Sequence, residues 1–534
     1  MINELKATLN RENNYQLTEN GAVGYKSTGS ALTDLNFRVT SMRNGITPDD
    51  MRLFCEAMNE DLEYAIKWLF FARDVRGGMG ERDVFQRFYM QYAELYPNEA
   101  KATLKLVAEF GRWKDVIDII NIDQDNNLGG MELVSETFHS DIQNCMAGKS
   151  ISLLAKWMPS INASGKARQQ AKRFVKHFGL TYEGYRKMLS KLRAYLDVTE
   201  VKTCANRWDE IDYNKVSSNA NKRYMNAFKK HDGERYMEHC AKALDVTSND
   251  VKMHASVLFP HEIWEKYTQL PGLSYDDCYY RDYYANSSYK FGYDMVEPAP
   301  ADISLEAMWK NLADMGDCGN TMVVVDGSGS MTSGYPVRPI NIARSLGVYF
   351  AERCQGEFNN ILMEFSSRPK LIDLNGCETL RDKVMELSKY TDCSNTDIEA
   401  VFMLILQSAI NANMKQSDLP DRILIVSDME FDTATNQTRY VYGMKALFNE
   451  LADRYAKYGY KLPKLVFWNV NSRTKTIPMT ENEMGVVLVS GFSPNIMSMV
   501  MSDQTDPWLA LKEKLDEERY SCISDILKSV KCDD

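Results

Sequence analysis

Hydrophobic residues recur at helical spacing through the first half of the chain. Between about residues 49 and 270, apolar side chains return every three or four positions, as in Leu62-Glu-Tyr-Ala-Ile-Lys-Trp-Leu-Phe-Phe71. This spacing predicts helices that each bury one stripe. Short breaks rich in Gly, Asn or Pro separate the stretches, so we expect paired helices stacked as an α-solenoid. No fixed sequence period accompanies them, and regular repeats are therefore not predicted.

The second half of the chain, from about residue 306 to 505, alternates short apolar runs with amphipathic stretches. Continuous apolar runs bounded by turn residues indicate strands buried on both faces of a parallel sheet. The predicted strands are Thr321–Val325, Ile361–Phe365, Arg422–Ser427, Leu465–Trp468 and Val486–Ser490, and the predicted helices are Ile340–Cys354, Ile398–Ile410 and Arg439–Lys457. Such alternation is typical of a doubly wound α/β fold, whose ligands bind at the carboxyl ends of the strands.

These patterns divide the chain into an α-helical domain (1–270), a linker (271–305), the α/β domain (306–505) and a terminal segment (506–534). A single helix, Trp508–Val530, is expected to pack back on the body. Seven tyrosines lie between Ser274 and Tyr293 of the linker. Such rings either stack on nucleic-acid bases or anchor a connector on neighbouring domains, and both interpretations stay open.

Composition narrows the class of protein. Of 534 residues, 44% are hydrophobic and 26% charged, as in ordinary globular proteins. No run of eighteen apolar residues predicts a membrane span, and the N-terminal Met-Ile-Asn-Glu-Leu-Lys lacks the apolar core of a signal peptide. The eleven cysteines are scattered without a Cys-x-x-Cys pair, which favours free thiols over a zinc site or disulfide framework. We therefore expect a cytoplasmic protein.

Charge is uneven along the chain. The net charge is −11, yet residues 151–235 hold 18 Lys/Arg against 8 Asp/Glu, a local net of +10. A basic segment within an acidic protein favours contact with nucleic-acid phosphates, because such contacts act within roughly 10 Å at physiological salt. The alternative is a solvated helical surface paired with acidic neighbours.

The strand that begins at Thr321 runs directly into Asp326-Gly-Ser328-Gly-Ser330. Two glycines allow a sharp turn in which one carboxylate and two hydroxyls face the same way. This all-oxygen set suits Mg²⁺ or Mn²⁺ better than zinc or copper. Waters or a partner's carboxylate would have to complete the coordination shell. The alternative is a strand and turn that bind no metal.

The Asp-x-Ser-x-Ser spacing resembles the metal-ion-dependent adhesion site of von Willebrand factor A domains. Ser394-Asn-Thr396-Asp397 precedes a predicted helix and Ser427-Asp428 ends a predicted strand, in the order that the family uses. The resemblance implies that Asp326, Ser328, Ser330 and Thr396 surround the metal and that Asp428 acts through water. The family usually continues Asp-Gly, whereas Met429-Glu430 follows here.

The segment Arg73-Asp-Val-Arg-Gly-Gly-Met-Gly-Glu-Arg82 is rich in glycine. It lacks the Gly-Lys-Ser/Thr ending of a phosphate-binding P-loop, and no parallel strand precedes it. We expect its glycines to turn a corner between two helices and its arginines to lie free on the surface.

Together these features resemble the Ro/TROVE proteins and, more closely, a little-characterised viral, phage and plant family of that layout. The markers are Arg76-Gly-Gly-Met-Gly-Glu-Arg82, Lys156-Trp-Met-Pro-Ser-Ile-Asn162 and Leu258-Phe-Pro-His-Glu262. TROVE proteins usually have Gly-Lys-Gly where this chain has Gly78-Met-Gly80, so one basic residue is missing. The resemblance implies a ring or arc of HEAT-like helical repeats followed by a von Willebrand A domain, with small structured or single-stranded RNA as partner. Candidate phosphate contacts are Lys156, Lys166, Arg168, Lys172, Arg173, Lys176, Arg186, Lys187, Lys191 and Arg193.

Catalysis is not expected. All six histidines precede the predicted α/β domain, which excludes a Ser-Asp-His hydrolase order within it, and no Gly-x-Ser-x-Gly surrounds Ser328 or Ser330. His261 follows Pro260 and fits the start of a helix better than a catalytic role. Two functions remain. The first is an RNA-binding scaffold that carries a divalent-metal site. The second is a metal-dependent module for protein adhesion, whose partner supplies an acidic ligand and whose helical part has no RNA role.

Overall fold

The computed structural model describes most of the chain. The described residues are 13–247, 250–273, 297–334, 337–365, 369–390, 397–431, 439–478, 486–501 and 506–533. Seven linker tyrosines and Thr396 lie outside them. Contacts divide the chain into two compact units that are not contiguous in sequence. We call them the sheet unit (within 1–60, 240–249 and 255–514) and the helical unit (within 61–239, 250–254 and 515–534).

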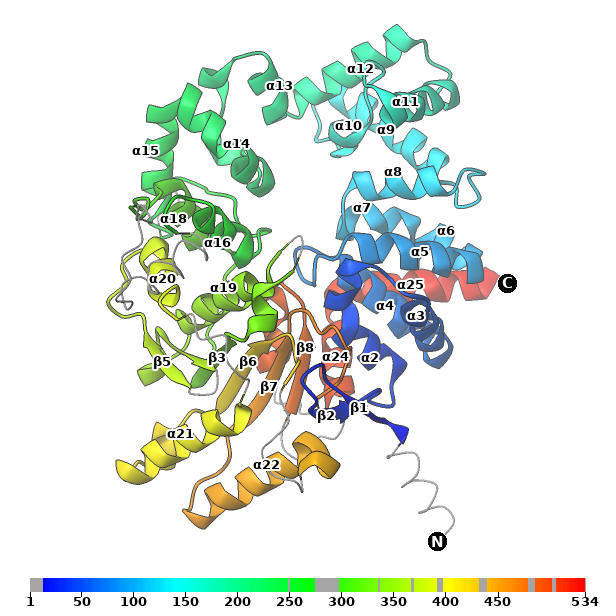
Figure 1. Cartoon of the computed structure of the whole chain (residues 1–534). Helices are drawn as coiled ribbons and strands as arrows, with labels where there is room; N and C mark the ends of the chain where they lie inside the picture. The colour runs from blue at the N-terminus through cyan, green and yellow to red at the C-terminus, as the bar shows by residue number, and fades with distance from the viewer. Residues whose placement is uncertain are drawn as a thin grey trace, which may run out of the picture. The chain divides into compact units, whose positions relative to one another are not determined.

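The sheet unit is built on six strands in the spatial order β5-β4-β3-β6-β7-β8. The edge strand β5 is antiparallel to β4, and all the other pairings are parallel. The strands are β3 (Thr321–Asp326), β4 (Ile361–Phe365), β5 (Lys370–Asp373), β6 (Arg422–Ser427), β7 (Lys464–Asn469) and β8 (Val486–Ser490) (Figure 1). The sequence prediction of an α/β unit with five buried strands is confirmed, and β5 was missed because it is short and largely exposed.

Helices cover both faces of this sheet. On one face α19 (Pro339–Ala351) approaches β3 so closely that a Cβ at Gly347 would lie 2.4 Å from Val325. On the other face α21 (Ile398–Asn411) and α22 (Arg439–Lys457) share a hydrophobic core with Val324, Ile425 and Phe467. Alternate residues of the central strands therefore serve opposite faces, as strand geometry requires. Shorter helices complete the unit: α16 (Pro260–Thr268), α18 (Ile303–Lys310), α20 (Leu380–Leu387), α23 (Met497–Met501) and α24 (Pro507–Leu515).

The N-terminal segment belongs to the sheet unit. A hairpin of β1 (Tyr15–Leu17) and β2 (Val23–Tyr25) precedes α2 (Ala31–Arg38) and α3 (Pro48–Glu60). Tyr25 forms an isolated antiparallel bridge with Ile477. The Asn469 side-chain amide donates to the Phe37 carbonyl at 2.8 Å. The sequence-based boundary had placed the first 270 residues in the helical domain, whereas contacts assign the described residues 13–60 to the sheet unit.

The helical unit contains helices throughout its described residues. Its helices are α4 (Leu62–Arg73), α5 (Asp83–Leu95), α6 (Pro97–Thr103), α7 (Val107–Phe110), α8 (Trp113–Ile122), α9 (Gly130–Met146), α10 (Leu154–Trp157), α11 (Gly165–His177), α12 (Tyr182–Tyr195), α13 (Thr199–Cys204) and α14 (Ser218–His231). The next helix, α15 (Gly233–Ala243), begins in the helical unit and ends in the sheet unit. Most of them pack on near neighbours in the chain, as α7 does on α8 and α11 on α12. The predicted helical character is confirmed, while the ring or arc stays a prediction.

The glycine-rich segment after α4 turns the expected corner. A Cβ at Gly78 would lie 2.0 Å from the Phe71 carbonyl oxygen, and Gly80 has φ +73°, so both positions require glycine. The expectation of free arginines is wrong for Arg73. Its side chain is buried and forms an ion pair with buried Asp115, with Nε 2.8 Å from Oδ2. This pair ties α4 to α8.

The C-terminal segment forms two helices, not the predicted single one: α24 and α25 (Glu518–Asp533). Asp516, in the break between them, accepts hydrogen bonds from Tyr64 at 3.0 Å and Lys67 at 3.1 Å. The buried Tyr520 ring then stacks on Phe110, with centroids 5.6 Å apart and planes 16° apart. α25 is thereby built into the core of the helical unit. Among the helices described, none is both long and apolar enough for a membrane crossing.

We expect Tyr520→Ala to destabilise the helical unit by about 3–5 kcal/mol, because it removes a fully buried aromatic ring and leaves a cavity beside Phe110. Amide hydrogen exchange should accelerate in α4 and α7, measured by mass spectrometry. Ser521→Ala, at an exposed position of the same helix, is the control. Unchanged exchange in α4 and α7 would show that α25 is not part of their core.

Candidate functional site

Two aspartates lie at neighbouring strand ends. Asp326 ends β3 and Asp428 directly follows β6, and the parallel register pairs Val325 with Val426. In sequence order the strands run outward from β3 in one direction and then from β6 in the other. The gap between β3 and β6 is therefore the topological switch point, where ligands of open α/β sheets bind.

The turn after β3 brings together the first three predicted residues. The Ser328 backbone N–H donates to Asp326 Oδ1 at 2.8 Å, and the Ser328 and Ser330 hydroxyl oxygens lie 2.9 Å apart. The Ser427 hydroxyl donates to Asp326 Oδ2 at 2.5 Å. Asp326 is 1% exposed and Ser328 5% exposed, whereas Ser330 is half-buried, so one side of this oxygen cluster is accessible.

A third carboxylate, that of Glu364, packs against Gly327 in the turn after β3. Glu364 of β4 is buried, and a Cβ at Gly327 would lie 2.6 Å from its Oε1, so only glycine fits there. Arg344 of α19 donates to Glu364 at 3.1 Å. Burial raises the pKa of Glu364 to about 7, against the opposing effect of Arg344. The sequence signal for this residue was one charge in an otherwise apolar predicted strand.

The loop after β6 has a left-handed backbone conformation at Met429. Met429 stands where the von Willebrand A family has glycine, and it adopts φ +63°, in the left-handed region that favours glycine. Its side chain is 1% exposed and belongs to the hydrophobic core of the sheet unit. Core packing thus holds a strained backbone.

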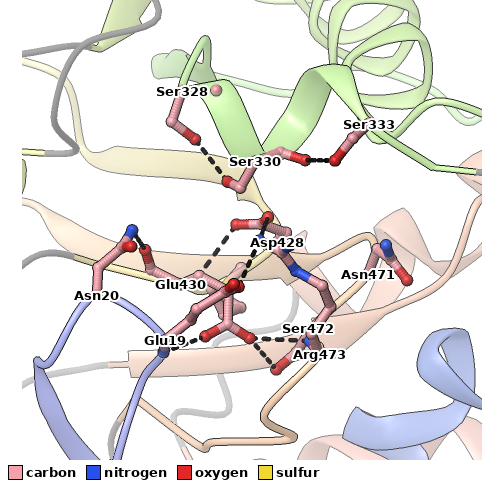
Figure 2. A network of polar contacts seen from close by, with 12 residues as sticks. Glu19, Asn20, Ser328, Ser330, Ser333, Asp428, Glu430, Asn471, Ser472 and Arg473 are labelled. Atoms are coloured by element: carbon pink, nitrogen blue, oxygen red, sulfur yellow. Dashed lines mark hydrogen bonds and ion pairs between the residues drawn. The ribbon is translucent and has the colours of Figure 1, made fainter.

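Asp428 lies between the serine turn and this loop (Figure 2). It is 1% exposed, and its Oδ2 is buried without a hydrogen-bond partner. Burial, followed by the negative charge of Asp326, raises the pKa of Asp428 to about 7. The nearest cation is the Arg473 guanidinium, with Nη2 3.6 Å from Oδ2. The Glu19 carboxylate holds the same guanidinium at 2.7 Å.

Glu430 joins three separate segments beneath the site. Its buried carboxylate accepts from the backbone N–H of Glu19, Arg473 and Thr474, each at 2.8 Å, and from the Thr474 hydroxyl. Its own carbonyl accepts from the Asn20 side chain at 2.6 Å. Figure 2 shows the N-terminal loop, the loop after β6 and the 471–473 segment converging on it. In the sequence, Glu430 stands out only as a departure from the Asp-Gly pattern, and Arg473 belongs to no motif that would have predicted it.

The oxygen atoms around Asp326 meet part of the needs of a divalent cation. Asp326, Ser328, Ser330 and Asp428 offer only oxygen ligands, as Mg²⁺ and Mn²⁺ prefer, and Asp428 Oδ2, which accepts no hydrogen bond, could serve as one of them. Thr396 lies outside the described residues. Within those residues, no group of three or more His, Cys, Asp or Glu side chains is arranged to hold a metal. A metal here would therefore depend on the two serine hydroxyls.

The predicted phosphate contacts lie in the helical unit, in two groups. Six are exposed and have no hydrogen-bond or ion-pair partner within the described chain: Lys166, Arg168, Lys172, Lys176, Arg186 and Lys191. The other four have partners. Lys156 faces Glu200 at 3.7 Å, Lys187 pairs with Glu183 at 2.8 Å, and Arg173 lies 3.5 Å from the Ile120 carbonyl. Arg193 donates to Ala155 O, Met158 O and Ser160 Oγ, so it closes the end of α10.

Two protein-family models match this chain. The model of DUF2828, a domain of unknown function, matches residues 18–141 and 161–315, just over half of the sequence. The chain belongs to the DUF2828 family. A second domain of unknown function, DUF7788, matches residues 320–525, which include the candidate site. The DUF2828 match begins in the N-terminal segment that packs in the sheet unit and extends through the helical unit.

Similar proteins include one from a virus. The uncharacterized protein L728 of Acanthamoeba polyphaga mimivirus is 29% identical over 525 residues, which cover 92% of this DUF2828 protein and 85% of the viral one. Among solved structures, the crystal structure of the RO (RSR) protein of Deinococcus radiodurans matches with a TM-score of 0.34 and 12% identity. That match covers 88% of this chain and 98% of the other.

Glu430→Gln is expected to loosen the N-terminal segment. The amide nitrogen would face backbone N–H groups that now donate to a carboxylate, at a cost of about 2 kcal/mol or more. Limited proteolysis should then cleave more rapidly near residues 15–25. Glu357→Gln, at an exposed glutamate of the same unit away from this loop, is the matched control. Equal cleavage of wild type and Glu430→Gln would contradict the role of Glu430.

Proposed function

We propose that this DUF2828 protein is an RNA-binding scaffold whose contact surface includes the α11–α12 hairpin. Residues 165–195 contain nine Lys/Arg and one Glu, and six of the cations have no partner in the described chain. Arg168, Lys172 and Lys176 are spaced by four residues and so lie on one side of α11. Like charges at this spacing destabilise a helix, and an anionic polymer would relieve that repulsion.

The sequence motifs support the same proposal. The Arg76–Arg82 and Lys156–Asn162 segments resemble those of Ro/TROVE proteins, which implies small structured RNA or a single-stranded end as the ligand class. Arg73 and Arg193 have structural roles in the protein, so the surface that we assign to RNA consists of the six unpartnered cations. We propose no catalytic step, and we propose the cytoplasm as the location.

A second proposed function concerns the sheet unit, which we interpret as a doubly wound von Willebrand A-like domain. Asp326, Ser328, Ser330 and Asp428, with Thr396 as a further ligand, would hold Mg²⁺ or Mn²⁺ at the switch point. The observation that favours this is the buried Asp428 oxygen that lacks a donor. A bound divalent cation supplies a coordination position for a carboxylate of a protein partner. The same chain can carry both functions, because RNA and protein would contact different units.

Removing three cations from α11 should weaken RNA binding and its salt dependence. For Arg168→Ala/Lys172→Ala/Lys176→Ala, we expect the slope of log K against log salt to fall by about 2, because each contact to single-stranded RNA contributes about 0.7. Fluorescence anisotropy with a labelled RNA hairpin carrying a single-stranded tail, between 50 and 200 mM salt, measures it.

The control removes three exposed cations of the sheet unit, Arg52→Ala/Lys370→Ala/Lys457→Ala, and changes net charge equally. Equal losses in the two triple variants would attribute binding to overall charge. Absence of RNA binding by the wild type at low salt would reject the proposed function itself.

Mg²⁺ or Mn²⁺ should stabilise the sheet unit. At a concentration one hundred times the dissociation constant, a ligand that binds only the folded state contributes about 2.7 kcal/mol. We expect a rise in Tm for the wild type and none for Asp326→Asn, which removes charge but keeps an oxygen for Ser328. Asp314→Asn, at an exposed carboxylate, is the control. An unchanged wild-type Tm on addition of either cation would reject the metal site.

Arg473→Gln separates a metal effect from general charge. The guanidinium 3.6 Å from Asp428 Oδ2 offsets the negative charge that a metal needs. Its removal should therefore tighten cation binding by about tenfold. Weaker binding in this variant would show that Arg473 holds the site in shape and does not compete with the cation.

A further inference from the structure

The helical unit contains a cavity of about 550 Å³ that the proposed phosphate surface does not use. Its walls come from four helices, α10, α12, α13 and α14. They include Lys156, Trp157, Arg193, Glu200, Val201 and Arg223. The volume lies in the range of small-molecule sites, roughly 300–1,000 Å³. An aromatic ring, apolar side chains and charges of both signs line one space.

One oxygen of the carboxylate in this cavity accepts no hydrogen bond. Glu200 Oε2 is buried and accepts no hydrogen bond, and the Lys156 ammonium lies 3.7 Å away, beyond hydrogen-bond distance. A buried acceptor without a donor costs free energy, so native proteins rarely retain one without a reason. A ligand that brings an N–H group would satisfy it. An acidic ligand would instead meet its repulsion.

Trp157 supplies the aromatic wall of the cavity. Trp157 is half-buried, and the Arg112 guanidinium lies 5.2 Å from its ring centroid. Val201 and Ala205 line the same cavity with apolar surface. An indole beside aliphatic side chains offers the flat apolar contact on which a nucleic-acid base stacks.

Two arginines of the cavity differ in whether their guanidinium groups already have hydrogen-bond acceptors. Arg193 is committed to three acceptors at the end of α10, so its charge is fixed in the wall. Arg223 is exposed and has no hydrogen-bond or ion-pair partner within the described residues. A free guanidinium at the rim is suited to bind a phosphate that stays in solvent.

We infer that this cavity binds one nucleotide of a single-stranded RNA, with a base that presents an amino group. The base stacks on Trp157, its exocyclic amine donates to Glu200, and its phosphate pairs with Arg223. Cytosine fits, because its N4 amine is the donor that Glu accepts, whereas uracil presents a carbonyl oxygen at that position. The inference rests on the proposed RNA binding for its ligand class and adds base selectivity to it.

Two pentaribonucleotides, C5 and U5, test this inference, because they carry equal charge and differ in the edge that Glu200 would read. Anisotropy of 5′-labelled pentamers should show C5 binding about tenfold tighter than U5 in the wild type. Glu200→Gln should bring the ratio to about one, because an amide can serve either base. Trp157→Ala should weaken both pentamers equally. Glu183→Gln, at an exposed carboxylate of α12, should retain the preference.

The outcomes separate this site from the basic hairpin. Equal affinity for C5 and U5, or a preference that survives Glu200→Gln, would overturn the inference while RNA-hairpin binding stands. Failure of both pentamers and of the RNA hairpin would reject the cavity assignment together with the proposed function. Displacement of C5 by a penta-glutamate peptide would assign the cavity to an acidic protein segment and would also overturn it. Circular dichroism of each variant checks that the helices are retained.

Discussion

The parallel pairing of β3 with β6 is the constraint on which the candidate site depends. Because Val325 is in register with Val426, the residues after each strand emerge side by side at one edge of the sheet. Asp326 and Asp428 are placed there by backbone hydrogen bonds, and the turn between Asp326 and Ser330 then adds two hydroxyls. Two buried carboxylates at one edge repel each other, which is why burial and Asp326 together raise the pKa of Asp428.

Glu430 explains how residues 13–60 belong to the sheet unit. Three backbone N–H groups from two distant segments donate to one buried carboxylate, so the N-terminal loop cannot leave without exposing several unsatisfied groups. Lys475 and Asp50 add a second tie, with a shortest distance of 2.6 Å and Asp50 1% exposed. The C-terminal helix α25 is joined to the helical unit in a similar way, because Arg519 and Tyr520 both donate hydrogen bonds to the buried Asp74. The N-terminal segment thus belongs to the sheet unit, whose strands β3 to β8 lie in the second half of the chain. The C-terminal helix belongs to the helical unit, whose other helices lie in the first half.

The helical unit separates structural cations from unpartnered ones. Arg73 and Arg193 are half to fully buried and satisfy carboxylate or carbonyl acceptors, and desolvation lowers the pKa of each guanidinium from its ordinary value. Six exposed cations of α11 and α12 lack such acceptors within the described residues. Positive charge that the protein itself does not neutralise is what an RNA ligand would require, and the adjacent cavity at Trp157 would add contact with a base.

The amino-acid sequence by itself determined the helical first half, five of the six sheet strands and the placement of Asp326 and Asp428 at strand ends. The helices follow from the spacing of apolar residues and the strands from continuous apolar runs. Both patterns lie within a few neighbouring residues of the sequence. Tertiary structure alone decided that residues 13–60 join the sheet unit, that α25 enters the helical core, and that Arg73 is buried. It also decided that Met429 holds a glycine-like backbone and that Glu19, Glu364 and Arg473 surround the site. Those outcomes depend on contacts between residues tens to hundreds of positions apart, whose partners no local pattern names.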